Sequence, residues 1–82
     1  MKKKTVLITG AARGIGFATA QAMASDGWNV GLLDRDEDAL HQAAQQIPDA
    51  KALMYDVSNP QDSARAIADT LATFGGLDGL VN

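Results

Sequence analysis

Residues Thr9–Gly16, which read Thr-Gly-Ala-Ala-Arg-Gly-Ile-Gly, have the composition of a phosphate-binding turn. They follow a short apolar run and open a segment with helical periodicity, the context in which a glycine-rich loop binds phosphate. The first turn of a helix has unpaired N–H groups and partial positive charge, and both attract a pyrophosphate. Gly10, Gly14 and Gly16 have no Cβ, so the backbone can turn sharply and lie close to the ligand. The competing interpretation is a tight strand-to-helix turn without a ligand, since turns collect glycine for structural reasons.

Asp34 is the second residue that could contact a nucleotide. It lies 18 residues after Gly16, at the end of an apolar run, where a carboxylate can accept hydrogen bonds from ribose hydroxyls. A 2′-phosphate would meet this carboxylate with like charge, which favours NAD over NADP. Arg13 and Arg35 leave that preference open, because either guanidinium could pair with a phosphate. Taken alone, Asp34 could instead be a solvated member of the charged run that starts there.

Asp56 and Val57 close the next apolar run. In a doubly wound sheet the strand ends line the ligand crevice, so a carboxylate and a small apolar side chain here could hold an adenine. Asp56 could equally be the start of the turn into Ser58-Asn59-Pro60.

The elements that position these residues alternate between short strands and longer helices. Strands are predicted at Thr5–Thr9, Asn29–Leu33, Ala50–Tyr55 and Leu77–Asn82. A helix is predicted over Ile15–Ser25, a second follows Asp36 as its cap and stops at Pro48, and a third follows Asn59 and ends near Gly75. The expected buried faces are Ile15, Ala18, Thr19 and Ala22; Leu40, Ala43, Ala44 and Ile47; and Ala64, Ile67, Ala68 and Leu71. Strand–helix–strand repeated three times predicts an α/β fold with a parallel sheet.

Composition excludes several function classes. The net charge is −3, and three of the seven basic residues are Lys2, Lys3 and Lys4 at a solvated tip, so the acidic remainder argues against nucleic acid as partner. The apolar run behind the lysines is too short for a signal core or membrane span, so a cytoplasmic protein without membrane contact is expected. Without cysteine and with His41 alone, no metal site is expected.

Taken together, Thr9–Gly16, Asp34, Asp56-Val57 and the closing Leu77-Asp78-Gly79-Leu80-Val81-Asn82 resemble the N-terminal part of a short-chain dehydrogenase/reductase. The resemblance covers essentially the whole chain. It implies a partial Rossmann-type doubly wound parallel sheet of about four strands and three helices, with NAD as the cofactor. Asn82 resembles the first asparagine of the family's Asn-Asn-Ala-Gly segment, near the adenosine ribose. The cofactor-binding residues implied by the similarity are Gly10, Arg13, Gly14, Ile15, Gly16, Asp34, Asp56, Val57 and Asn82.

The same resemblance implies that residues 1–82 are a truncated dinucleotide-binding domain ending at its fourth strand. The family transfers hydride between NAD and an alcohol or carbonyl substrate with a Tyr-x-x-x-Lys pair. The only tyrosine here, Tyr55, has Asn59 four residues on in place of lysine. No catalytic residue is therefore expected in the chain, and the small substrate would bind only the complete protein.

Two alternatives stay open beside the oxidoreductase. One is a dinucleotide-binding or purely structural fragment without turnover. The other is an S-adenosylmethionine methyltransferase, which also places a glycine loop after strand one and acids after strands two and three; Thr9 and the Leu-Val-Asn ending favour the dehydrogenase. If strand four lies beside strand one, its far side is an unpaired apolar edge, and such an edge predicts self-association.

Overall fold

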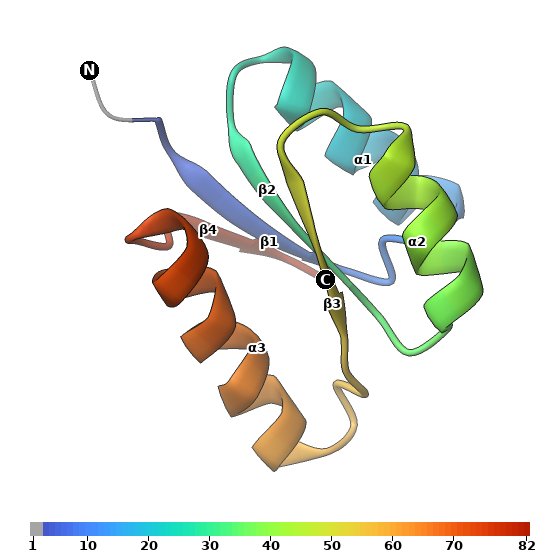
Figure 1. Ribbon diagram of the computed structural model, residues 1–82, viewed down its shortest axis with the longest axis vertical. Helices are drawn as coiled ribbons and strands as arrows, with labels where there is room; N and C mark the ends of the chain where they lie inside the picture. Colours follow the sequence, from blue (N-terminus) through green and yellow to red (C-terminus); the bar gives the residue numbers. More distant parts are fainter. Residues whose placement is uncertain (1–2) are drawn as a thin grey trace.

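A four-stranded parallel sheet runs through the middle of the molecule, with helices on both of its faces (Figure 1). The computed structural model describes residues 3–82, so Lys2 of the expected lysine tip lies outside the described residues. The elements in order are β1 (Thr5–Thr9), α1 (Gly14–Ser25), β2 (Asn29–Asp34), α2 (Glu37–Gln45), β3 (Ala50–Met54), α3 (Pro60–Phe74) and β4 (Gly79–Val81). The predicted fold class, with four strands and three helices, is confirmed.

The strand order is β3-β2-β1-β4, so the chain first moves outward from β1 and then returns to its other side. The register pairs Thr9 with Leu33, which brings the residues that follow β1 and β2 to the same edge of the sheet. The reversal of strand order at β1 creates a crevice outside the carboxyl ends, where open α/β sheets bind their ligands.

Both faces of the sheet are buried, which explains the near-continuous apolar runs in β1 and β2. On one face α1 and α2 cover a core that includes Val6, Ile8, Val30 and Leu32 (Figure 1). On the other face α3 covers Leu7, Leu33 and Leu53, with Ala66 of the helix packed against them.

The predicted face of α2 is confirmed, since Leu40, Ala43 and Ile47 are buried and Ala44 packs against the same core. The predicted face of α1 is wrong. Ile15 is 87% exposed, and the residue that α1 buries completely is Ala20. The cause is the glycine turn: Gly16 lies against the backbone of Gly10, and Ala20 follows Gly16 by one helical turn on the same side.

The predicted face of α3 is also wrong. Ile67 and Leu71 are 40% and 45% exposed, whereas Ala66 and Thr70 are buried. The Thr70 hydroxyl donates to the Ala66 carbonyl at 2.8 Å, so this polar side chain is satisfied inside its own helix and can face the sheet.

Candidate functional site

The turn after β1 has a backbone that requires glycine at three positions. Gly10 and Gly14 have φ values of 59° and 63°, in the left-handed region that L side chains rarely adopt. Gly16 has ordinary dihedrals, but a Cβ there would lie 2.2 Å from the carbonyl oxygen of Gly10. The three glycines therefore set the path of the turn and the close approach of α1 to it.

The amino end of α1 differs from those of the other two helices. Asp36 accepts a hydrogen bond from the Ala39 N–H and so caps α2, and Asn59 accepts one from the Gln61 N–H and caps α3, as predicted for both. Arg13 precedes α1 and provides no side-chain cap. The first N–H groups of α1 therefore stay available to an anion, with the exposed Ile15 beside them.

Asp34 connects the glycine turn to the start of α2. Its Oδ2 accepts the Ala12 N–H at 3.1 Å, and its Oδ1 accepts the Asp36 N–H at 3.0 Å. Each carboxylate oxygen keeps a further lone pair. The side chain is thus held in place while it can still accept hydrogen bonds from a ligand.

A pocket of about 290 Å³ opens between the ends of β2 and β3. Its lining residues are Gly10, Leu33, Asp34, Arg35, Tyr55, Asp56, Val57 and Ser58. Four of the predicted cofactor contacts are therefore brought together in one place.

Asp56 is ordered within that pocket by its neighbour. Its Oδ1 accepts the Ser58 hydroxyl at 2.7 Å and the Ser58 N–H at 2.9 Å, and these hydrogen bonds hold the pKa of the carboxyl below its usual value. Val57 beside it is 51% exposed, which leaves an apolar surface at the rim.

The other predicted contacts lie on the same edge but outside this pocket. Arg13, Gly14, Ile15 and Gly16 belong to the turn and the first turn of α1. Asn82 follows β4, where its Oδ1 lies 3.2 Å from the Thr9 hydroxyl oxygen. The nine residues therefore form an extended surface along the carboxyl ends of the strands.

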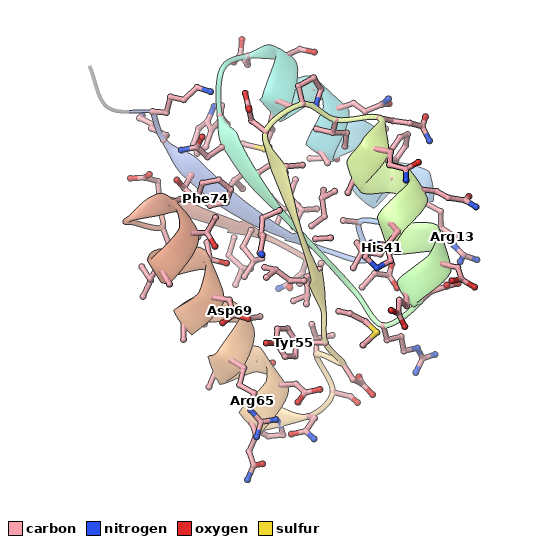
Figure 2. All side chains as sticks on the ribbon, in the orientation of Figure 1. Arg13, His41, Tyr55, Arg65, Asp69 and Phe74 are labelled. Atoms are coloured by element: carbon pink, nitrogen blue, oxygen red, sulfur yellow. The ribbon has the colours of Figure 1, made fainter. Side chains whose placement is uncertain are left out.

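Among the side-chain pairs that were not anticipated from the sequence, two involve residues next to the candidate site. Arg13 forms an ion pair with Asp36. The Tyr55 hydroxyl donates to the carboxylate of Asp69 in α3 at 2.5 Å, and both residues are labelled in Figure 2. Tyr55 follows β3 instead of ending it, and the hydrogen bond to Asp69 raises its pKa. The helix-cap pattern had identified Asp36, but it gave no signal that a residue 23 positions earlier would contact it.

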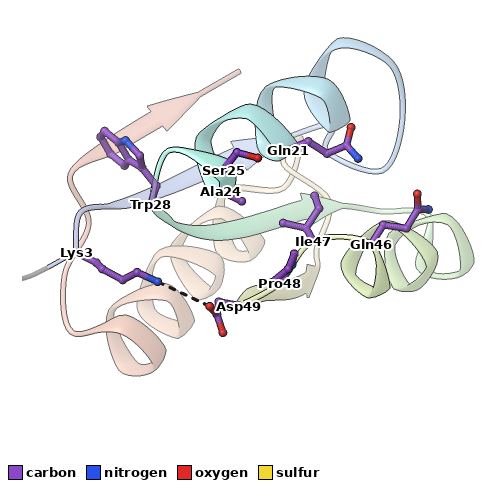
Figure 3. Close-up of a pocket in the computed structure, with 9 residues that line it drawn as sticks. All are labelled: Lys3, Gln21, Ala24, Ser25, Trp28, Gln46, Ile47, Pro48 and Asp49. Carbon is purple, nitrogen blue, oxygen red and sulfur yellow. Dashed lines mark ion pairs between the residues drawn. The ribbon is translucent and has the colours of Figure 1, made fainter.

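A second pocket, of about 210 Å³, lies at the amino ends of the strands (Figure 3). Lys3, Trp28 and Asp49 in its lining precede β1, β2 and β3, and the Lys3 Nζ lies 3.8 Å from the Asp49 Oδ2. Parallel sheets bind ligands at their carboxyl ends, so we place the candidate site at the other pocket.

The part of the chain from residue 3 to residue 82 shows no group of three or more His, Cys, Asp or Glu side chains placed to hold a metal ion. None of the helices in this range combines the length and the apolar character that a bilayer crossing requires.

Comparison with known proteins adds an independent finding. The family model described as short chain dehydrogenase matches residues 4–82. A 2,5-dichloro-2,5-cyclohexadiene-1,4-diol dehydrogenase of Sphingobium indicum is 37% identical over 81 residues, which cover 96% of this chain and 32% of that protein. A sorbitol dehydrogenase of Cereibacter sphaeroides is 41% identical over 80 residues, with 96% and 31% covered. The chain thus spans about a third of the length of these relatives.

Solved structures give the same result. A 3-ketoacyl-(acyl-carrier-protein) reductase from Brucella melitensis, complexed with NADH, superposes with a TM-score of 0.92 at 35% identity, covering 96% of this chain and 33% of that one. A short chain dehydrogenase/reductase from Burkholderia phymatum in complex with NAD gives 0.93 at 31% identity, covering 96% and 30%. These matches do not favour the methyltransferase alternative.

Proposed function

This chain belongs to the short chain dehydrogenase family as an NAD(P)-binding portion, and from that premise we propose that NAD lies along the carboxyl edge of its sheet. One observation carries the proposal. The Ala12 N–H donates a 3.1 Å hydrogen bond to the Asp34 carboxylate. This bond fixes the glycine turn, which would bind the pyrophosphate, relative to Asp34, which would bind the ribose. When bound, NAD supplies or accepts a hydride; this chain's own residues bind and orient the dinucleotide.

The pyrophosphate occupies the amino end of α1. Gly10, Gly14 and Gly16 leave the backbone without side chains there, and the uncapped N–H groups donate to the phosphate oxygens. The backbone of Arg13 and the exposed Ile15 lie at the start of α1 and contact the same part of the cofactor.

The adenosine occupies the pocket between β2 and β3. Asp34 accepts hydrogen bonds from the ribose 2′- and 3′-hydroxyls, for which its oxygens keep free lone pairs. The Asp56 carboxylate accepts a hydrogen bond from the adenine amino group, and Val57 packs against the adenine ring. Asn82, which follows β4, lies near the ribose. A 2′-phosphate would meet the Asp34 carboxylate, so NAD is the preferred cofactor.

Titration of the isotopically labelled chain with NAD, followed by amide chemical shifts, tests this assignment. We expect shifts that saturate at Gly14, Gly16 and Asp34, with a dissociation constant in the millimolar range. S-adenosylmethionine serves as the matched adenosine ligand and should produce much weaker shifts. Absence of saturable NAD shifts, or tighter binding of S-adenosylmethionine, would contradict the proposal.

The whole-protein reaction that the family implies is hydride transfer between NAD and a small alcohol or carbonyl compound. The family's Tyr-x-x-x-Lys pair is not formed by Tyr55, which is followed by Asn59 and is bound to Asp69. We therefore assign the chemical step to residues other than those of this chain. Purified 82-residue protein with NADH and a panel of ketones should show no turnover.

The exposed edge of β4 is proposed to pair with a second copy of this chain. Among the described strands β4 pairs only with β1, and Leu80 on it is 55% exposed. An unpaired apolar edge is a template for association. The cytoplasmic location likewise stands as a proposal, supported by the cysteine-free, acidic composition and testable by cell fractionation.

A further inference from the structure

The ion pair between Arg13 and Asp36 joins the turn after β1 to the loop after β2, the segments that contribute Gly10 and Asp34 to the proposed adenosine pocket. Arg13 directly precedes α1 and Asp36 directly precedes α2, so the pair bridges the amino ends of two helices. The two oxygens of Asp36 have separate partners: Oδ1 accepts the Ala39 N–H at 3.2 Å, and Oδ2 contacts the Arg13 guanidinium.

The pair is also adjacent to the acid that we assign to the ribose. The Asp36 N–H donates to Asp34 Oδ1 at 3.0 Å, and the other oxygen of Asp34 accepts the Ala12 N–H, next to Arg13 in the chain. Arg13 is therefore connected through Asp36 to the residue that we assign to the ribose hydroxyls, and its charge already has a partner there.

We propose that Asp36 is a specificity-determining residue, which discriminates against NADP by keeping Arg13 in an ion pair. A 2′-phosphate could gain this arginine only by displacing the Asp36 carboxylate, which would then be a second unpaired negative charge next to Asp34. Asp36 thus acts through Arg13 without contacting the NAD ribose itself. The inference rests on the proposed function, since it presupposes that a dinucleotide binds at this edge.

Asp36→Asn is the variant that separates this role from helix capping. Asparagine caps helices about as well as aspartate, so its single oxygen can still accept the Ala39 N–H. Its amide NH₂ then faces the guanidinium and cannot accept from it. Arg13 is released while α2 keeps its cap.

The matched control is Asp38→Asn, which removes one negative charge from the exposed first turn of the same helix. The dissociation constants of NAD and NADP are measured for the starting chain and both variants by amide shift titration. We expect Asp36→Asn to raise the affinity for NADP relative to NAD by about two- to fivefold, the range of an exposed ion pair, and Asp38→Asn to change the ratio much less.

A double variant, Arg13→Gln with Asp36→Asn, completes the test. The gain in relative NADP affinity should disappear in it, because the gain depends on Arg13. If the double variant kept the gain in relative NADP affinity, the gain would come from another cation, such as Arg35 in the pocket lining. That result would overturn the inference. An unchanged ratio in Asp36→Asn would also overturn it.

Failure of the proposed function gives a different result. In that case the starting chain shows no saturable NAD shifts at all. If only this inference fails, NAD still binds, and the ratio of NADP to NAD affinity is the same in Asp36→Asn as in the starting chain. Thermal unfolding of Asp36→Asn near that of the starting chain confirms that the cap is preserved.

Discussion

The carbonyl oxygen of Gly10 lies 2.2 Å from the point that a Cβ on Gly16 would occupy. No real Cβ tolerates a backbone oxygen at that distance, so the turn and the first turn of α1 fit together only without a side chain. The same contact fixes how α1 is rotated about its axis and which of its residues face the sheet.

Gly16→Ala is therefore expected to destabilise the chain by about 1–3 kcal/mol, the usual cost of overpacking. Alanine is otherwise favoured over glycine within a helix by about 1 kcal/mol, so a loss of stability isolates the steric clash. Urea unfolding measures the change. Gly76→Ala is the control, because a Cβ there would have nothing within 4 Å. Equal stability of the two variants would contradict the clash.

Asp34→Asn is expected to weaken NAD binding about tenfold to hundredfold, which corresponds to hydrogen bonds to a charged group of about 1.5–3 kcal/mol. The Ala12 N–H and the Asp36 N–H are accepted now by different oxygens of Asp34, and in asparagine one of these oxygens is replaced by an NH₂ group that cannot accept. NAD titration measures the change, with Asp38→Asn as the charge-matched control. Similar losses in both variants would indicate a general charge effect instead of a ribose contact.

Stability at acid pH depends on Asp36 and Asp56, whose pKa values are held below 3.8 mainly by the Ala39 N–H and by Ser58, respectively. A lowered pKa in the folded chain contributes stability that is complete above the unfolded value and lost as pH falls through the folded value. The thermal midpoint should therefore drop below about pH 4. Ser58→Ala should make this drop shallower, whereas Ser25→Ala at the far end of α1 should not.

Stability at alkaline pH depends on Tyr55, whose pKa is raised above 10.0 by its hydrogen bond to Asp69. A raised pKa contributes stability below the unfolded value and loses it as pH rises through the folded value. Tyr55 is the only tyrosine, so ultraviolet absorbance of the tyrosinate reports it alone. Asp69→Asn should move the titration back toward its ordinary pH; an unchanged curve would mean that the bond does not form in solution.

Leu80→Lys should reduce self-association, because a charge on an exposed edge strand opposes edge-to-edge pairing. Sedimentation velocity over a range of concentrations measures the effect. Met54→Lys is the control, since Met54 is exposed to a similar degree (51%) on the opposite edge strand, β3. A starting chain that stays monomeric throughout would remove the basis of the proposal.

The sequence predicted the strands, the helix caps and the edge that carries the candidate site, because each has a local cause. Asp36 and Asn59 cap the helices that they precede, and Asp34 and Asp56 reach one pocket because parallel strands end together. The buried faces of α1 and α3 were not predictable in this way. In α1 the rotation about the helix axis is set by the contact of Gly16 with Gly10. In α3 a threonine is expected on the exposed face, but Thr70 can be buried because its hydroxyl donates to the Ala66 carbonyl.

The ion pair between Arg13 and Asp36 could not be predicted from the sequence for a different reason. In the sequence Arg13 is a possible partner for a phosphate and therefore weakens the preference for NAD. Whether Arg13 has a partner depends on the distance between the turn after β1 and the loop after β2. The register that pairs Thr9 with Leu33 brings these two segments together. Local patterns contain no information about that distance.

The order in which the strands are added has a consequence for biosynthesis. The glycine turn, Asp34 and every residue that lines the adenosine pocket lie between Gly10 and Ser58, and β2 pairs with β1 and with β3 without β4. A nascent chain that has emerged from the ribosome as far as Ser58 already contains the whole pocket. Since chains fold from the amino end during synthesis, this segment can form its three strands and the pocket before β4 is available for pairing.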